Sequence, residues 1–172
     1  MTCTIRPWLL DDAAALAAIL NNKTIQNNLR DGIPFPYTEQ DARDYLLSTL
    51  QSDPNSTFAF AITVDGAVAG SIGLFRQENI HCRTAELGYY VAEPLWGQGV
   101  GSAAVTQACR YVFATTDILR IFAEPFAYNL ASCRLLEKAG FQLEGVLRQN
   151  AVKHGQVLDM KLYSLLKEDG TA

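Results

Sequence analysis

Val91-Ala-Glu-Pro-Leu-Trp-Gly-Gln-Gly-Val-Gly-Ser102 is the stretch on which the fold prediction depends. An apolar run at residues 85–92 leads into it and is predicted as a strand, and helix formers at 103–113 follow it. Three glycines stand at alternate positions, Gly97, Gly99 and Gly101. A strand, a glycine-rich turn and a helix in this order leave backbone N–H groups free at a helix N-terminus, where the dipole favours negative charge. The stretch is therefore predicted to bind phosphate.

The glycine spacing excludes the two commonest phosphate loops. The pattern G-x-x-x-x-G-K-[ST] does not occur, so no lysine of the Walker type follows the turn. The run G-x-G-x-G also differs from G-x-G-x-x-G, and no acidic residue ends a second strand about twenty residues further on. A purely structural strand-to-helix turn is the alternative to a phosphate site.

Composition indicates one globular domain spanning 1–172. Of the 172 residues, 49% are hydrophobic and 19% charged, which is enough for a real core. The net charge is −4 without a basic cluster, which argues against nucleic acid or an anionic membrane as the main partner. The cysteines lie far apart and the two histidines, His81 and His154, fall in separate turns, so no metal is expected.

Targeting signals are not evident in the sequence. The N-terminus lacks the basic start and the long apolar run of a signal peptide. No stretch approaches 18 consecutive apolar residues, so none is expected to span a membrane. We therefore expect a cytoplasmic protein.

The remaining periodicities predict an alternation of strands and helices. Apolar runs predict strands at 2–8, 58–64, 68–75, 84–92, 119–124, 141–149 and 157–166. Helical spacing predicts helices at 13–20, 39–51, from Ser102 through 113, and 130–139, with a short polar helix at most within 24–29. Thr38 with Asp41 resembles a capping box, and Asp65-Gly66 and His154-Gly155 predict hairpins. The loop at 30–37 is unusually apolar, and either packs on the core or forms a wall of a site.

A second motif, Asn-Leu-Ala-Ser-Cys-Arg-Leu-Leu-Glu-Lys-Ala-Gly-Phe, covers residues 129–141. It resembles N-x-x-[AS]-x-x-x-[YL]-x-[KR]-x-G-F, which the GNAT N-acetyltransferases carry on the helix after their fifth strand. The glycine turn resembles the [QR]-x-x-G-x-[GA] acetyl-CoA pyrophosphate loop of the same family at Gly99 and Gly101. Trp96 departs from that pattern, because many members carry Gln or Arg there. An aromatic residue at this place resembles the Rim-type branch, which acetylates protein N-termini.

The resemblance covers nearly the whole chain and implies its fold. A GNAT fold is an α+β or α/β arrangement around a central, mixed, mostly antiparallel sheet of seven strands. Its parallel strands 4 and 5 are splayed apart, and four or five helices flank the sheet. A strand, a helix and a strand in succession at 84–124 agree with a parallel crossover.

The resemblance also implies an acetyl-CoA site, with acetyl-CoA as co-substrate and no metal. The turn offers backbone N–H groups to the pyrophosphate, from Gln98, Gly99, Val100, Gly101 and Ser102. The pantetheine arm is an amide chain that can pair with strand backbone, which points to Tyr90, Val91 and Ala92. Asn129 is expected both to cap its helix and to bind CoA. We expect bulky substitutions at Gly99 or Gly101 to block the approach of the phosphate.

Acetyl transfer needs a group that takes the proton of the amine, and Glu86 is the first candidate. It lies inside the fourth strand, where a carboxylate needs a reason, although an exposed residue on a half-solvated face is the alternative. Asp159 is the rival carboxylate. For the departing thiolate, the tyrosine that many members carry is replaced by Leu136, whereas Rim-type members have a serine at the position of Ser132. Ser132 could equally be a capping residue of its helix, with Tyr89 and Tyr128 as other donors.

The leading functional hypothesis is a Rim-type N-acetyltransferase that acts on a protein or peptide N-terminal amine by direct transfer. A small-amine acetyltransferase, for an aminoglycoside or a polyamine, and a non-catalytic acyl-CoA-binding module on the same fold are the alternatives. Acceptor recognition is expected in the segments 24–37 and 153–157, which carry no motif. The oligomeric state stays open, with a homodimer as one alternative.

Overall fold

A computed structural model describes residues 1–169. Within this range the chain forms seven strands and five α-helices, together with short 3-10 turns. The strands are β1 (Cys3–Pro7), β2 (Thr57–Val64), β3 (Ala67–Arg76), β4 (Thr84–Val91), β5 (Arg120–Ala123), β6 (Gln142–Lys153) and β7 (Gln156–Leu166). The helices are α1 (Ala13–Leu20), α2 (Lys23–Gln26), α3 (Glu39–Gln51), α4 (Val100–Thr115) and α5 (Leu130–Lys138).

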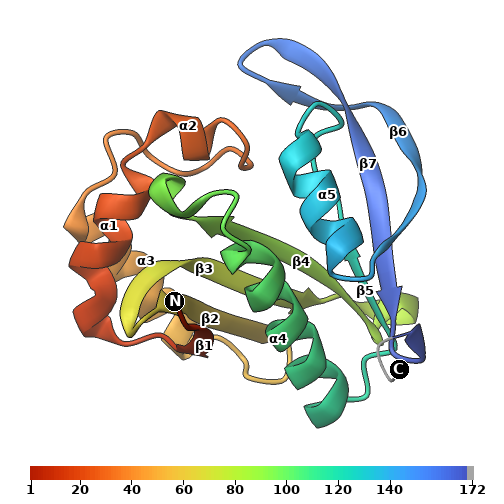
Figure 1. The fold of residues 1–172 in the computed structure, drawn as a ribbon, viewed down its shortest axis with the longest axis horizontal. Helices are drawn as coiled ribbons and strands as arrows, with labels where there is room; N and C mark the ends of the chain where they lie inside the picture. The colour runs from red at the N-terminus through yellow and green to blue at the C-terminus, as the bar shows by residue number, and fades with distance from the viewer. Residues whose placement is uncertain (170–172) are drawn as a thin grey trace.

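The strands form one mixed sheet in the order β1-β2-β3-β4-β5-β7-β6 (Figure 1). Every neighbouring pair is antiparallel except β4 and β5, which run parallel as expected of a crossover through α4. In the described chain, the β4–β5 pairing joins Thr84–Glu86 to Arg120–Phe122 and ends there, although β4 continues to Val91. The expected splaying of these two strands is confirmed, and it opens the sheet beyond Glu86.

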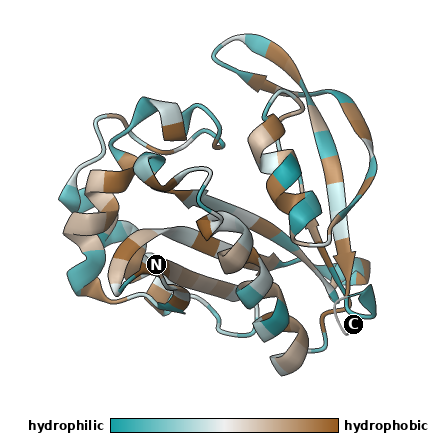
Figure 2. Cartoon of the chain, in the orientation of Figure 1, coloured by the Kyte–Doolittle hydropathy of each residue, from teal (hydrophilic) through white to brown (hydrophobic). Residues whose placement is uncertain are grey.

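Helices cover both faces of the sheet. One core lies under α4 and α5, where Val105, Val112 and Leu136 are fully buried against the strands. The other lies under α1 and α3, around Leu16 and Leu46. Figure 2 shows hydrophobic and hydrophilic residues alternating along α4 and α5, as in helices with one face on a sheet. No helix within residues 1–169 is long and apolar enough to cross a membrane.

Local sequence signals account for most of the element boundaries. Thr38 and Asp41 form the expected capping box at the start of α3, and Asp65 and Gly66 form the turn between β2 and β3. α4 begins at Val100, two residues before the predicted start, because Gly99 in a left-handed conformation serves as its N-cap. β6 extends to Lys153 rather than ending at Gln149, because an irregularity between Leu147 and Ala151 lets pairing with β7 resume after the interruption.

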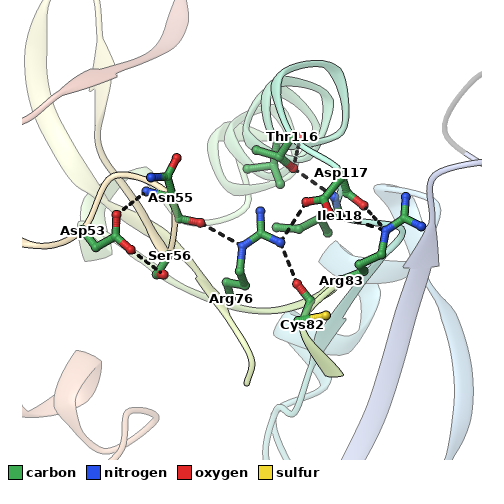
Figure 3. Close-up of polar contacts among 10 residues, drawn as sticks. Asp53, Asn55, Ser56, Arg76, Cys82, Arg83, Thr116, Asp117 and Ile118 are labelled. Atoms are coloured by element: carbon green, nitrogen blue, oxygen red, sulfur yellow. Dashed lines mark hydrogen bonds and ion pairs between the residues drawn. The ribbon is translucent and has the colours of Figure 1, made fainter. Parts of the chain in front are cut away.

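A cluster of polar contacts closes the end of the sheet away from the open part of β4 (Figure 3). Arg76 of β3 donates to the carbonyl oxygens of Asn55 and Cys82, and forms an ion pair of 2.9 Å with Asp117. Arg83 donates through Nε to the carbonyl oxygen of Asp117. These contacts join the loops before β2, β4 and β5, so this end of the sheet is fixed while the other is split.

Candidate active site

The split between β4 and β5 leads to a cavity of about 420 Å³. Its walls come from the free part of β4, the turn before α4, the first turn of α4, one side of α5, and the α2 region. Arg134 and Lys138 of α5 line it and bring positive charge to this side. An elongated anionic ligand therefore meets backbone donors and two cations along the same wall.

The turn before α4 presents its N–H groups to this cavity. Gly99 has a φ of +82°, a conformation that strongly favours glycine. A Cβ built there would meet no other atom within 4 Å, so the backbone angle and not lack of space calls for glycine. The first helical bond of α4 runs from the Ala103 N–H to the Gly99 oxygen, which leaves the N–H groups of Val100, Gly101 and Ser102 ahead of it. Free N–H groups at a helix N-terminus are suited to binding an anion.

Gly101 has a packing role that the sequence motif did not indicate, in addition to its place on the cavity wall. A Cβ at Gly101 would overlap the Cδ1 atom of Leu135 on α5. The absence of a side chain lets α5 approach the first turn of α4. A bulky substitution at Gly101 therefore disturbs helix packing before it obstructs a phosphate, and Gly99 is the better position at which to test anion binding.

Strand alternation decides which backbone groups of β4 face the opening. The Ala92 N–H donates to the Ala69 oxygen of β3 at 2.8 Å. The N–H and C=O groups of one strand residue point to the same side, and the side alternates from one residue to the next. The backbone groups of Tyr90 therefore also point to β3, whereas those of Tyr89 and Val91 point to the open edge. The Trp96 indole donates to the Val91 oxygen at 2.8 Å and fixes the turn against this edge.

The remaining predicted cofactor residues are divided, because some of them line the cavity and others do not. Asn129 lines it and caps α5, accepting the Ser132 N–H at 3.2 Å. Ser102 lines it and donates its hydroxyl to the Gly99 oxygen. The side chain of Gln98 is exposed and donates to the Pro94 oxygen. Within residues 1–169, neither Gln98 nor Ala92 lines this cavity.

A second cavity, of about 220 Å³, lies beside the first and shares part of its lining. Tyr89 and Ser132 line both cavities, and their hydroxyl groups share a hydrogen bond of 2.6 Å. Burial raises the pKa of Tyr89 to about 12, so its phenol keeps its proton at neutral pH. Ser132 does lie in the first turn of α5, but its side chain is directed to Tyr89, which makes a two-hydroxyl group at the junction.

Glu86 lines the second cavity and is already paired. Arg30, from the loop after α2, forms an ion pair with Glu86 and lies 4.0 Å from Glu124. The side chains of Glu86 and Glu124 are 21% and 24% exposed, whereas that of Arg30 is 65% exposed. Burial, and secondly the charge of Glu86, raise the pKa of Glu124. Two carboxylates thus face one guanidinium at the mouth of this cavity.

The rival groups from the sequence lie elsewhere. The Asp159 carboxylate accepts the Gln149 N–H at 2.7 Å and lines a separate hollow beside the irregularity of β6. The Tyr128 hydroxyl donates to Asn27 and Asn28 and its ring stacks on Phe126, which ties it to the loop after α2. The structure therefore places Glu86 and Ser132 on one cavity and Asp159 on another.

Sequence reasoning missed Arg30 and Glu124, and it ranked Tyr89 only as a fallback. Glu124 follows directly on β5, so its position at the split could have been inferred from the strand order. Tyr89 is three residues from Glu86 on the same strand, which places the two side chains on opposite faces. Arg30 carries no signal of its own, because its partner is far away in the sequence. The apolar loop at 30–37 does both things considered for it, since Tyr37 is buried in the core while Arg30 lines the cavity.

Comparison with known proteins agrees with this geometry. Residues 3–142 match the family model described as an acetyltransferase (GNAT) domain. The chain therefore belongs to the GNAT acetyltransferase family, and it is an N-acetyltransferase by this membership.

Among curated relatives, it is 40% identical over 98 residues to the uncharacterized N-acetyltransferase YoaA of Bacillus subtilis, a match that spans 57% of this chain and 55% of YoaA. It is 29% identical to the putative ribosomal N-acetyltransferase YdaF of Bacillus subtilis, over 96% of this chain and 92% of YdaF.

Solved structures share the fold over almost the whole length. RimL, a ribosomal L7/L12 α-N-protein acetyltransferase in complex with coenzyme A, superposes with a TM-score of 0.86 at 22% identity, over 96% of this chain and 94% of RimL. The spermidine N-acetyltransferase of Vibrio cholerae, in complex with CoA and spermine, gives a TM-score of 0.83 at 21% identity, over 99% and 98%. At these identities the likeness defines the fold and leaves the acceptor open.

Proposed function

We propose that this chain transfers the acetyl group of acetyl-CoA directly to the α-amine of a protein or peptide N-terminus in a ternary complex. The observation that carries the proposal is the meeting of two cavities at the split between β4 and β5. One is lined by backbone donors and cations suited to CoA, and the other by carboxylates suited to an ammonium group. The Rim-like names among relatives and neighbours support an N-terminal acceptor.

In this proposal, acetyl-CoA lies in the larger cavity. The N–H groups of Val100, Gly101 and Ser102 bind the pyrophosphate, with Arg134 and Lys138 neutralising further charge. The pantetheine amides pair with the open edge of β4 at Tyr89 and Val91 rather than at Tyr90 and Ala92. Trp96 already occupies the Val91 oxygen, which leaves the Val91 N–H as the donor on this side. The thioester then reaches the junction at Tyr89 and Ser132.

The chemistry requires one proton to leave and one to arrive. The amine nitrogen attacks the thioester carbon, the C–S bond breaks, and sulfur takes the electron pair. Glu86 accepts the proton of the amine, directly or through a water, and the Ser132 hydroxyl donates a hydrogen bond to the thiolate. Tyr89 keeps its proton and can donate a hydrogen bond to the Ser132 oxygen, because the two hydroxyls are 2.6 Å apart, and the thiolate takes its proton from solvent after CoA leaves. An α-amine, with a pKa of about 7.7–8.0, is the easiest primary amine to deprotonate here.

A small polyamine is the second candidate acceptor. The pair Glu86 and Glu124 places two carboxylates at one cavity, and a polycation satisfies two carboxylates better than a single ammonium does. The spermidine N-acetyltransferase that shares the fold agrees with this possibility.

An acceptor screen tests the proposed function. Release of the CoA thiol is followed with a thiol-reactive dye, with peptides that begin with Ala or Ser, the same peptides N-acetylated, spermidine and an aminoglycoside. The proposal expects release with free N-termini and none with the blocked peptides. Release with spermidine alone would favour the second candidate. Acetyl-CoA binding by calorimetry without release from any amine would indicate a non-catalytic binding module.

A further inference from the structure

Residues 27–31, which we call the strap, cross from the end of α2 toward the β6–β7 hairpin. Lys153 of the hairpin forms an ion pair of 2.8 Å with Asp31, and the Lys153 side chain is only 9% exposed. His154 lies 3.2 Å from the Asn27 amide oxygen. Figure 1 shows the hairpin tip and α2 at the same end of the molecule. The strap is thus held at both of its ends by the hairpin.

Arg30 is the residue of the strap that points into the site. Its guanidinium pairs with Glu86 and lies 4.0 Å from Glu124, and the strap residues Asn28 and Leu29 line both cavities beside it. The guanidinium therefore occupies the place where the proposed reaction needs the ammonium group of the acceptor. Glu86 cannot accept a proton from an incoming amine while this pair is closed.

We propose that Arg30 is an internal occupant of the acceptor's ammonium position, and that an acceptor reaches Glu86 by displacing it. This inference rests on the proposed function for its kinetic consequence. Displacement by an ammonium ion exchanges one cation for another between the same two carboxylates, whereas a neutral ligand would leave both carboxylates without a partner. Arg30 thereby favours acceptors that arrive as cations over neutral ones.

The exposure of Arg30, Glu86 and Glu124 determines how strongly Arg30 competes with the acceptor. A partly exposed ion pair is weak, so the closed state competes with the acceptor without blocking it. The apparent affinity for the acceptor falls by the fraction of molecules in which the site is open. Removal of the guanidinium should therefore lower KM for a cationic acceptor by about two- to fivefold.

Kinetics of Arg30→Ala at saturating acetyl-CoA test the inference. We expect a lower KM for the acceptor peptide with a similar kcat, while Arg30→Lys stays near the parent. Millimolar guanidinium chloride should act as a competitive inhibitor of Arg30→Ala and restore the parent KM. Arg43→Ala is the matched control, because Arg43 is exposed on α3 and pairs with Glu39. An unchanged or higher KM, or a lower kcat, in Arg30→Ala would overturn the inference and make Arg30 an acceptor-binding or positioning residue.

A binding measurement separates this inference from the proposed function. The Arg30 Nε–Hε signal is assigned by its loss in Arg30→Ala and followed in the unmodified chain during addition of methylammonium chloride. The chemical shift of this signal should change much more with methylammonium chloride than with sodium chloride at equal ionic strength. The signal of Arg6, which pairs with Asp12, should not change and serves as the control. Equal shifts with both salts would overturn the inference. No CoA release from any amine would count against the proposed function alone.

Discussion

Tyr89 and Ser132 both line the two cavities, and a hydrogen bond joins their hydroxyl groups. No other hydroxyl pair in the described chain has this position. The buried Tyr89 phenol, whose pKa is raised to about 12, stays protonated and can donate a hydrogen bond to the Ser132 oxygen, which would orient the Ser132 hydroxyl. The serine is held by the N-cap of Asn129, which fixes the first turn of α5. In the proposed reaction this pair is a donor that these contacts already position.

Ser132→Ala should lower kcat by roughly tenfold or more, toward the 10²-fold scale of a general acid, with little change in acetyl-CoA affinity. The reason is that the proposed hydrogen bond forms to the developing thiolate and not to the bound thioester. Tyr89→Phe should also lower kcat, and the double variant should lose less than the product of the two effects. Steady-state rates and calorimetry measure this, with exposed Ser48→Ala as control. A large loss of affinity at unchanged kcat would contradict the account.

Helix packing is the feature that matters at the scale of elements. α4 and α5 form one wall of the larger cavity, and they touch where Gly101 faces Leu135. The sequence identified this glycine through its motif but could not show which neighbour it accommodates. Contacts between helices separated by a strand depend on the three-dimensional arrangement.

Gly101→Val should destabilise the protein by about 1–3 kcal/mol, because the new side chain overlaps Leu135. Leu135→Ala in the same chain should recover part of that loss, since it removes the overlapping atoms. Urea unfolding of the two single variants and the double variant gives the coupling energy. Strictly additive effects would show that the two residues do not meet.

Much of the element pattern could be predicted from the sequence, because caps and turns are local. Thr38 with Asp41, Asp65 with Gly66, and the N-cap Asn129 all occur as expected. In the candidate site, the residues that lie within the two sequence motifs could be predicted. The pairing of Arg30 with Glu86 joins a loop without a motif to a strand far along the chain, so no local pattern reports it. The sequence also could not show which backbone groups of β4 face the open edge, because that depends on the register between β4 and β3.

At the scale of the whole molecule, ion pairs join segments that the sheet alone does not hold. Asp12 is buried, accepts two hydrogen bonds of 2.8 Å from Arg6, and accepts the Leu9 N–H. The hydrogen bonds from Arg6 are the main reason that the pKa of Asp12 is lowered. This contact connects β1 to the start of α1 and so joins the sheet to the helical layer on one face.

Acid should lower the free energy of unfolding, partly because Asp12 becomes protonated. Because the pKa of Asp12 is lower in the folded chain, its stabilisation is fully present above the unfolded pKa of about 3.9 and is lost as the pH falls toward the folded value. Urea unfolding of the parent and of Asp12→Asn should therefore differ clearly at pH 7 and much less near pH 3. An equal difference at both pH values would show that ionisation of Asp12 does not contribute.

The central claim is that Glu86, at the split between β4 and β5, takes the proton of the acceptor amine. The most direct test is the pH profile of kcat/KM for an N-terminal alanine peptide with Glu86→Gln, compared with the unmodified chain. A general base contributes about 10²–10⁴-fold, so Glu86→Gln should lower kcat/KM within that range and flatten its rise with pH, while calorimetry shows unchanged acetyl-CoA binding. Near-native kcat/KM at every pH would contradict the claim.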